Sequence, residues 1–290
     1  NMQQYVAAAV CRAVDSRKCL RLQGLTAPRE PGCQPTWVFM MFQPYRLRRR
    51  ESVQMEAVAG MKLPWETPPD IYGIGMNYAS HARELGRDPP SSPLVFTKST
   101  SSFCTGPYIV LPDPTVEGKV DFEAELAVVI GPRPCWDATE ANAMNYVLGY
   151  AIANDVSGRY SQFESPNGGQ WSVSKGFDTF CSVQGEVTPA SHISDPHTLD
   201  IKTTLNGQIV QEGNTGDLIF SIPQLICFLS RRTTLLPGTI ILTGTPPGPG
   251  HFKLPPQYLK PGDVLSMEIT GLGVLTQEVI ANDDLRHSKL

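Results

Sequence analysis

Short apolar runs that end at glycine or proline are the feature that most constrains the fold of this chain. The sequence holds 25 glycines and 26 prolines, and both residues favour turns over the interior of regular elements. Residues 120–131 alternate and then become continuously apolar, residues 146–157 form a second buried run, and Asn206-Gly207 divides two alternating runs as a hairpin turn does. We therefore expect a mostly β (α+β) protein with a few helices, and a helix bundle is excluded.

Helices are expected at three places. Residues 77–86 form a short candidate, and residues 137–147 are alanine-rich, with Asp137 or Thr139 as the N-cap. Residues 221–232 begin with a serine cap, a proline two residues later and a basic last turn. These three segments are short, so the strands dominate.

The chain is expected to contain two domains of unequal size. Its 290 residues and 41% hydrophobic content are typical of a globular protein with a sizeable core. Three prolines fall within residues 62–75, a composition typical of a boundary. We expect a small β-rich N-terminal domain over residues 1–66 and a catalytic domain over residues 67–290.

Charge, hydropathy and cysteine content exclude several classes of function. With a net charge of −4, the chain has no excess of basic residues with which to bind nucleic acid. No apolar run is long enough to span a membrane. The seven cysteines are odd in number and never spaced as C-x-x-C, so we expect reduced, buried thiols and no zinc site.

The last three residues, Ser288-Lys289-Leu290, match a C-terminal peroxisomal targeting signal. The sequence therefore predicts the peroxisomal import receptor as a partner and the peroxisomal matrix, or the related glycosome, as the compartment. A cytoplasmic location is the alternative.

Acidic side chains follow a pattern that suggests a metal site. Glu123 and Glu125 lie two apart on an expected strand and project to the same face, and Asp155 closes a second buried strand. Three carboxylates at one point would hold a hard divalent cation such as Mg²⁺ or Mn²⁺, and no histidine or cysteine accompanies them to favour zinc. The alternative is that Asp121, Glu123 and Glu125 form an exposed acidic edge whose charges only prevent the strand from pairing with another chain.

A set of ordered motifs then resembles a known family. The segments GIGMNYASHARELG, VDFEAELAVVIG, ANDVSGR, SKGFDTF, ILTGTPPGPG and LKPGDVLSMEITGLG occur in this order between Ile71 and Val279. Together they resemble the fumarylacetoacetate hydrolase superfamily, and most of all the eukaryotic fumarylacetoacetate hydrolase domain-containing proteins. The resemblance implies a mixed β-roll/β-sandwich catalytic domain, a homodimer, and a bound Mg²⁺ or Mn²⁺, for which Ca²⁺ can substitute in crystals.

The resemblance also implies residue roles. The metal ligands would be Glu123, Glu125 and Asp155; the catalytic residues His81, Glu84 and Lys175; and the substrate-binding residues Arg159, Gln162 and Thr245. The chain departs from the family pattern at four positions: Ser99, Gly158, Tyr160 and Pro249. Of these, Tyr160 stands where an acid is common, so either it changes the packing or it frees Arg159 to meet an anionic substrate. The histidines at positions 192, 197, 251 and 287 show no partner pattern, and we assign them no role.

Three functions are compatible with these residues. The first is metal-dependent cleavage of a C–C bond in a small 2-oxo acid, by hydrolysis of an acylpyruvate or decarboxylation of oxaloacetate, through an enolate that the metal stabilises. The second is an oxaloacetate tautomerase or an isomerase of the 2-hydroxyhepta-2,4-diene-1,7-dioate type. The third is a homologue that binds metal and ligand without turnover.

Overall fold

The computed structural model describes residues 61–62, 67–166 and 168–282. They lie in a compact unit that spans residues 54–290. The predicted N-terminal domain falls outside the described residues except for β1 (Met61–Lys62), which pairs with β11 (Glu186–Pro189). Its existence therefore stays a prediction. Among the described residues, no helix is both long enough and apolar enough to cross a membrane.

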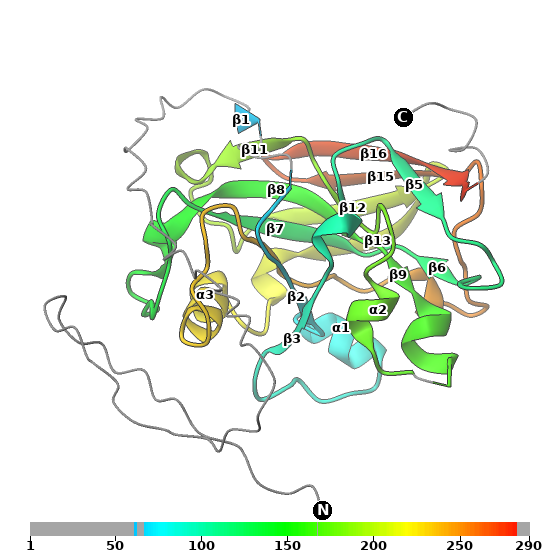
Figure 1. The fold of residues 1–290 in the computed structure, drawn as a ribbon, viewed down its shortest axis with the longest axis horizontal. Coiled ribbons are helices and arrows are strands. Elements are labelled where there is room, and N and C mark those ends of the chain that lie inside the picture. The colour runs from blue at the N-terminus through cyan, green and yellow to red at the C-terminus, as the bar shows by residue number, and fades with distance from the viewer. Residues whose placement is uncertain (1–60, 63–66, 167, 283–290) are drawn as a thin grey trace, which may run out of the picture. The chain divides into compact units, whose positions relative to one another are not determined.

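A nine-stranded sheet forms the larger layer of the fold (Figure 1). Its central strands are β7 (Ala124–Ile130) and β8 (Val147–Asp155), an antiparallel pair in which nearly every residue is buried. Because both faces of these strands are covered, their sequences are almost continuously apolar. From β1 and β11 the order runs through β8, β7, β14 (Ile240–Leu242), β2 (Ile71–Gly75) and β3 (Leu94–Thr97), while β10 (Cys181–Val183) joins β8 to β4 (Phe103–Cys104).

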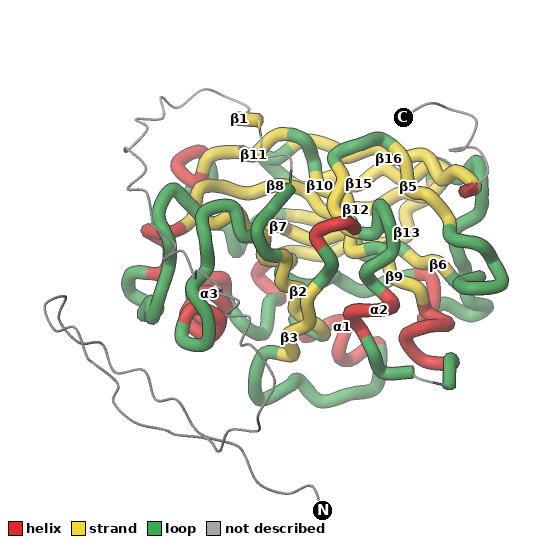
Figure 2. Tube along the Cα trace, in the orientation of Figure 1, coloured by secondary structure: helices red, strands yellow, loops and turns green. Residues whose placement is uncertain are grey.

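A second, five-stranded sheet packs against one face of the first (Figure 2). Its order is β13 (Gln208–Asn214), β12 (Asp200–Leu205), β15 (Val264–Ile269), β16 (Gly273–Ala281) and β5 (Tyr108–Leu111). Inward side chains such as Met267 and Ile269 share one core with Leu126 and Val128 of β7. The mostly β prediction is therefore confirmed. A separate ribbon pairs β6 (Val120–Asp121) with β9 (Ser157–Gly158).

The predicted hairpin turn is present between β12 and β13. Asn206 and Gly207 have φ values of 52° and 80°, as a type I′ turn requires at both central positions. The turn sets the register in which Leu205 lies opposite Gln208.

Two of the three predicted helices form, as α1 (Ala79–Glu84) and α3 (Ile222–Ser230). At the start of α3, the Gln224 side chain accepts a hydrogen bond from the Ser221 amide at 2.9 Å, half of the capping-box arrangement.

The helix predicted over residues 137–147 is wrong, because only the 3₁₀ turn η2 (Ala143–Tyr146) forms there. Asp137 has a left-handed φ of 47°, and the Asn142 side chain accepts a hydrogen bond from the Thr139 amide, a local turn that competes with helix. The chain enters β8 at Val147 directly afterwards. The elements that were not predicted include the π-helical turn η3 (Tyr160–Glu164) and the short helix α2 (Trp171–Ser174).

Candidate active site

The pairing of β7 with β8 brings the three predicted carboxylates together. Glu123 immediately precedes β7, Glu125 lies within it, and Asp155 ends β8. In the antiparallel register Ala124 faces Asn154, and the Asp155 amide donates to the Glu123 carbonyl at 2.8 Å. Each carboxylate thus comes from a strand whose position the core fixes.

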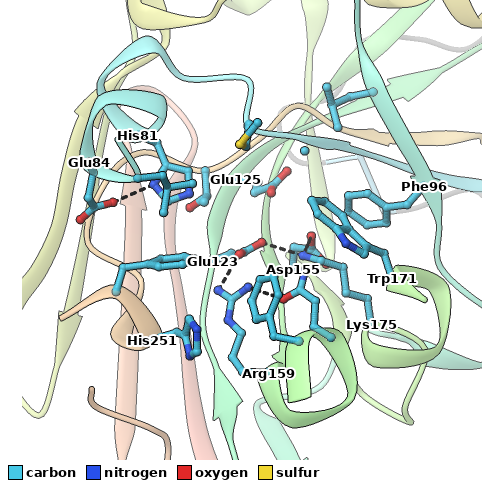
Figure 3. A pocket seen from close by; sticks show the side chains of 18 of the residues that line it. His81, Glu84, Phe96, Glu123, Glu125, Asp155, Arg159, Trp171, Lys175 and His251 are labelled. Atoms are coloured by element: carbon cyan, nitrogen blue, oxygen red, sulfur yellow. Dashed lines mark hydrogen bonds and ion pairs between the residues drawn. The ribbon is translucent and has the colours of Figure 1, made fainter. Parts of the chain in front are cut away.

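The three carboxylates are buried and line one cavity of about 440 Å³ (Figure 3). One oxygen from each lies within 4.8 Å of the others, and the residues Glu123, Glu125 and Asp155 are only 7%, 2% and 0% exposed. An exposed acidic edge is therefore excluded.

Side-chain amides hold the backbone where β7 begins. The Glu123 amide donates to Asn154 Oδ1 and the Ala124 amide donates to Gln211 Oε1, both at 3.1 Å. Gln211 Nε2 in turn donates to the Thr245 hydroxyl at 2.9 Å, and that hydroxyl donates to the Ala124 carbonyl. The Thr245 hydroxyl is thus engaged by protein groups, and its clear contribution is to fix the strand that carries the carboxylates.

Two buried lysines neutralise part of this acidic charge. Lys175 Nζ donates to Glu123 Oε2 at 2.7 Å and also to Asp155. Lys98 Nζ donates to the other oxygen of Asp155 and to the Val156 carbonyl. Lys98 was not predicted as a site residue. It directly follows β3, and a lone lysine at the end of an expected strand was the only signal for it.

The electrostatics of the trio suit a divalent cation. Burial tends to raise the pKa of Glu123, but the charges of Lys175 and Arg159 outweigh burial and bring that pKa well below its usual range. Glu125 accepts a hydrogen bond from the Gly244 amide at 2.7 Å, and no lysine or arginine among the described residues pairs with it. Burial, Asp155 and Glu123 therefore raise the pKa of Glu125. A cation bound to the three oxygens would relieve this repulsion.

Helix α1 places a histidine–glutamate pair over the same cavity. His81 Nδ1 lies 2.7 Å from Glu84 Oε2, and the Gly248 amide donates to Glu84 Oε1 at 3.1 Å. The Ser80 amide and hydroxyl both donate to Asp217. These contacts dock α1 at both ends and bury His81, which is 5% exposed. His81 Nε2 makes no hydrogen bond within the described part of the chain.

Arg159 is buried in a network of its own. Its Nε and Nη2 pair with Asp121 at 2.9 and 2.8 Å, Nη2 also pairs with Glu123 at 2.7 Å, and Nη1 donates to Gln162 Oε1. Burial opposes its charge, but Glu123 and Asp121 raise the pKa of Arg159 further. Arg159 is therefore not freed by the tyrosine at position 160, whose side chain is exposed.

Aromatic side chains form part of the cavity lining. Phe96 and Trp171, with ring centroids 5.5 Å apart, lie across the cavity from His251 (Figure 3). The Phe252 ring, which also lines the cavity, has its centroid 4.9 Å from that of His251. His251 belongs to the turn η6 (Gly250–Phe252) and lines the cavity, although its sequence context gave it no role. No local pattern could have placed it there.

Comparison with known proteins agrees with this architecture. The model of the fumarylacetoacetate (FAA) hydrolase C-terminal family matches residues 70–280, which is most of the chain. The chain belongs to this family. This match confirms the resemblance inferred from the motifs, and it places the chain in a family of enzymes.

Family relatives act in different ways. An oxaloacetate tautomerase, FAHD2A, from Bos taurus is 43% identical over 219 residues, covering 75% of this chain and 68% of the relative. A fumarylacetoacetate hydrolase from Exiguobacterium antarcticum has a solved structure with a TM-score of 0.68 and 34% identity, covering 76% and 78% of the two chains. A 2-hydroxyhepta-2,4-diene-1,7-dioate isomerase from Mycobacterium marinum has a TM-score of 0.64 and 34% identity, covering 77% of each.

The comparison also corrects the predicted compartment. The bovine tautomerase is named as a mitochondrial protein, so the peroxisomal or glycosomal prediction is wrong. The tripeptide Ser288-Lys289-Leu290 on which that prediction depended lies outside the described residues.

Proposed function

We propose that this chain is a divalent-metal-dependent enzyme that interconverts the keto and enol forms of oxaloacetate or a closely similar 2-oxo acid. The observation that carries the proposal is the buried His81, fixed by Glu84 and facing a cavity lined by three carboxylates and the Lys175 ammonium. Such a site needs only to move a proton and to stabilise an enolate. The similarity to an oxaloacetate tautomerase ranks this reaction above C–C cleavage.

Glu123, Glu125 and Asp155 would hold the metal, with Mg²⁺ or Mn²⁺ preferred by an all-carboxylate set. When bound, the ion would act as a Lewis acid toward the oxygen that becomes negative in the enolate. The chain's own residues perform the remaining steps.

His81 is the proposed general base. Its Nε2 takes a proton from the carbon next to the keto group, while Nδ1 keeps its hydrogen bond to Glu84. The carboxylate fixes the tautomer and stabilises the imidazolium that forms. The same nitrogen then returns the proton to the enolate oxygen, so every atom of the substrate is conserved.

Lys175 is the proposed electrostatic partner. Its ammonium is held by Glu123 and Asp155, and these two carboxylates raise the pKa of Lys175 although burial lowers it. The group therefore stays charged and supplies a fixed positive potential where the enolate forms. The Gln162 side-chain amide, oriented by Arg159, would bind the substrate, whereas Thr245 and Arg159 act by positioning.

C–C cleavage is a second candidate, favoured by the similarity to a fumarylacetoacetate hydrolase. It would use the same enolate. His81 would then activate a water for attack on a distal carbonyl, or protonate the enolate after CO₂ leaves.

The test is the rate of oxaloacetate enol decay and the NMR spectrum of the products, each with Mg²⁺ and with EDTA. We expect metal-dependent exchange without pyruvate, and a loss of roughly 10²- to 10⁴-fold in the His81→Gln variant, the range for removal of a general base. His192→Gln, a change at an exposed histidine, is the matched control. Pyruvate as the main product would move the assignment to cleavage, and no metal-dependent change of either kind would exclude both reactions.

Two further sequence predictions are kept as proposals. Residues 67–290 would form the catalytic domain, and two chains would associate as a homodimer. Light scattering on the full chain tests the second, since a mass near 31.7 kDa would contradict it.

A further inference from the structure

The ring of His251 is held in place on several sides. Its Nδ1 lies 2.9 Å from the Tyr258 hydroxyl, and its face stacks on Phe163 with centroids 5.2 Å apart and an interplanar angle of 21°. Phe252 meets its edge at 4.9 Å. The imidazole therefore has one defined orientation at the cavity wall.

The backbone beneath this ring is also fixed. The amides of Gly250 and His251 donate to the buried Asp121 carboxylate at 2.7 and 3.0 Å. Because the same carboxylate pairs with Arg159, His251 and Arg159 share one anchor. A side chain supported in this way is preorganised for binding.

These contacts leave one nitrogen of His251 available. Within the described chain, Nε2 has no hydrogen-bond partner. The Tyr258 hydroxyl can donate to Nδ1. In the tautomer that accepts this bond, the imidazole proton lies on Nε2, which is then a donor toward the cavity. The Gln162 amide nitrogen, which also lacks a partner among the described residues, belongs to the same cavity lining, and the next residue, Phe163, stacks on His251.

The position of His251 matches the far end of a short substrate. The Phe252 ring lies between the two histidines, with centroids 5.5 Å from His81 and 4.9 Å from His251. Figure 3 shows His81 beside the carboxylates and His251 lower on the same wall. A substrate with its 2-oxo acid end at the carboxylates can therefore extend past His81 and reach His251.

We propose that His251 is a specificity-determining residue whose Nε2–H binds the distal carboxylate of a 2-oxo dioic acid. The chain then favours such dioates over 2-oxo acids that end in a methyl or other apolar group. This inference rests on the proposed function, because it takes the carboxylate trio as the site of the 2-oxo acid end.

The charges around His251 agree with an anionic ligand. Burial and the neighbouring Arg159 lower the pKa of His251, with Lys119 acting in the same direction and Asp121 and Glu164 opposing them. The lowered pKa favours the neutral ring, which donates through Nε2 when Nδ1 accepts from Tyr258. A carboxylate that arrives at Nε2 meets a donor beside a cationic guanidinium.

The experiment compares two substrates of nearly equal size. Oxaloacetate ends in a carboxylate, and acetylpyruvate carries a methyl ketone in its place. In His251→Leu we expect kcat/KM for oxaloacetate enol–keto exchange to fall roughly 10- to 100-fold, mostly through KM, as for loss of one hydrogen bond to a charged group. Exchange of acetylpyruvate should change little. His251→Gln, which keeps a donor, should restore part of the preference, and His192→Leu is the control.

Equal losses on both substrates, or no loss on either, would overturn the proposal. Binding of two unreactive acids separates it from the proposed function. With Mg²⁺ present, calorimetry should show that 2-oxoglutarate binds more tightly than 2-oxopentanoate, and that His251→Leu removes the difference. This result would support the role of His251 even if the wild-type chain tautomerised neither substrate, whereas equal affinities in the wild-type chain would refute it.

Discussion

Replacing Asp121 by asparagine is expected to destabilise the protein strongly, although the two side chains have the same shape. The Asp121 carboxylate is fully buried. It accepts hydrogen bonds from the Phe122, Gly250 and His251 amides and pairs with Arg159. Every one of these partners is a donor, so the NH₂ group of an asparagine would face donors that it cannot satisfy.

The expected loss follows from the buried charge that remains. Of its charged partners in the described part of the chain, Arg159 would keep only Glu123, and breaking one side of a buried ion pair costs about 3–5 kcal/mol. For a domain of this size, that loss corresponds to a fall in Tm of roughly 6–20 °C.

Urea denaturation followed by tryptophan fluorescence and circular dichroism measures the change. Asp113→Asn is the matched control, because Asp113 is exposed and its side chain bonds only to Thr115 among the described residues; it should unfold close to the wild-type midpoint. The reasoning is refuted if Asp121→Asn unfolds within about 1 kcal/mol of the wild type at an unchanged m-value.

Three further predictions concern the site and its supports. Burial and its acidic neighbours raise the pKa of Glu125, and a carboxylate must be ionised to bind a metal. Mg²⁺ affinity should therefore fall as the pH drops through that raised pKa, by up to about tenfold per pH unit. Calorimetry in two buffers should show that Mg²⁺ binding releases a proton, and the Glu125→Gln variant should abolish this release. Lys98→Met leaves Asp155 with one cation fewer, so Mg²⁺ should raise the Tm of this variant more than that of the wild type, and an equal rise would contradict the role of Lys98. Gly248→Ala should lower both kcat and the urea midpoint, because φ is +105° and the new Cβ would lie 2.1 Å from the Val210 carbonyl oxygen.

The central part of the site was predictable from the sequence because it depends on local periodicity. Two glutamates at i and i+2 on a strand share a face, and an aspartate at the end of the neighbouring buried strand lies beside them. The pairing of β7 with β8, which was not predicted, brings the three carboxylates together. His81 and Glu84 were expected from the family resemblance, and the structure places them in contact.

The outer part of the site could not be predicted from local sequence patterns. His251 enters the cavity because its backbone binds Asp121, which is 130 residues away in the chain, and no short-range pattern encodes such a contact. Lys98 reaches Asp155 across 57 residues for the same reason. The family motifs imply that Arg159 contacts the substrate, but all three of its nitrogens already pair with Asp121, 38 residues earlier, Glu123 or Gln162.

The division between strand-borne and loop-borne residues has an evolutionary consequence. The carboxylates lie where β7 begins and β8 ends, on strands that belong to the core. Mutations there are therefore expected to reduce stability as well as activity. His251 and Phe163 lie on the turns η6 and η3, and connecting segments tolerate substitution better than buried strands do. A lineage with this scaffold can therefore acquire new substrates through changes in these turns while the enolate chemistry is inherited unchanged. This agrees with a family whose relatives include a tautomerase, a hydrolase and an isomerase.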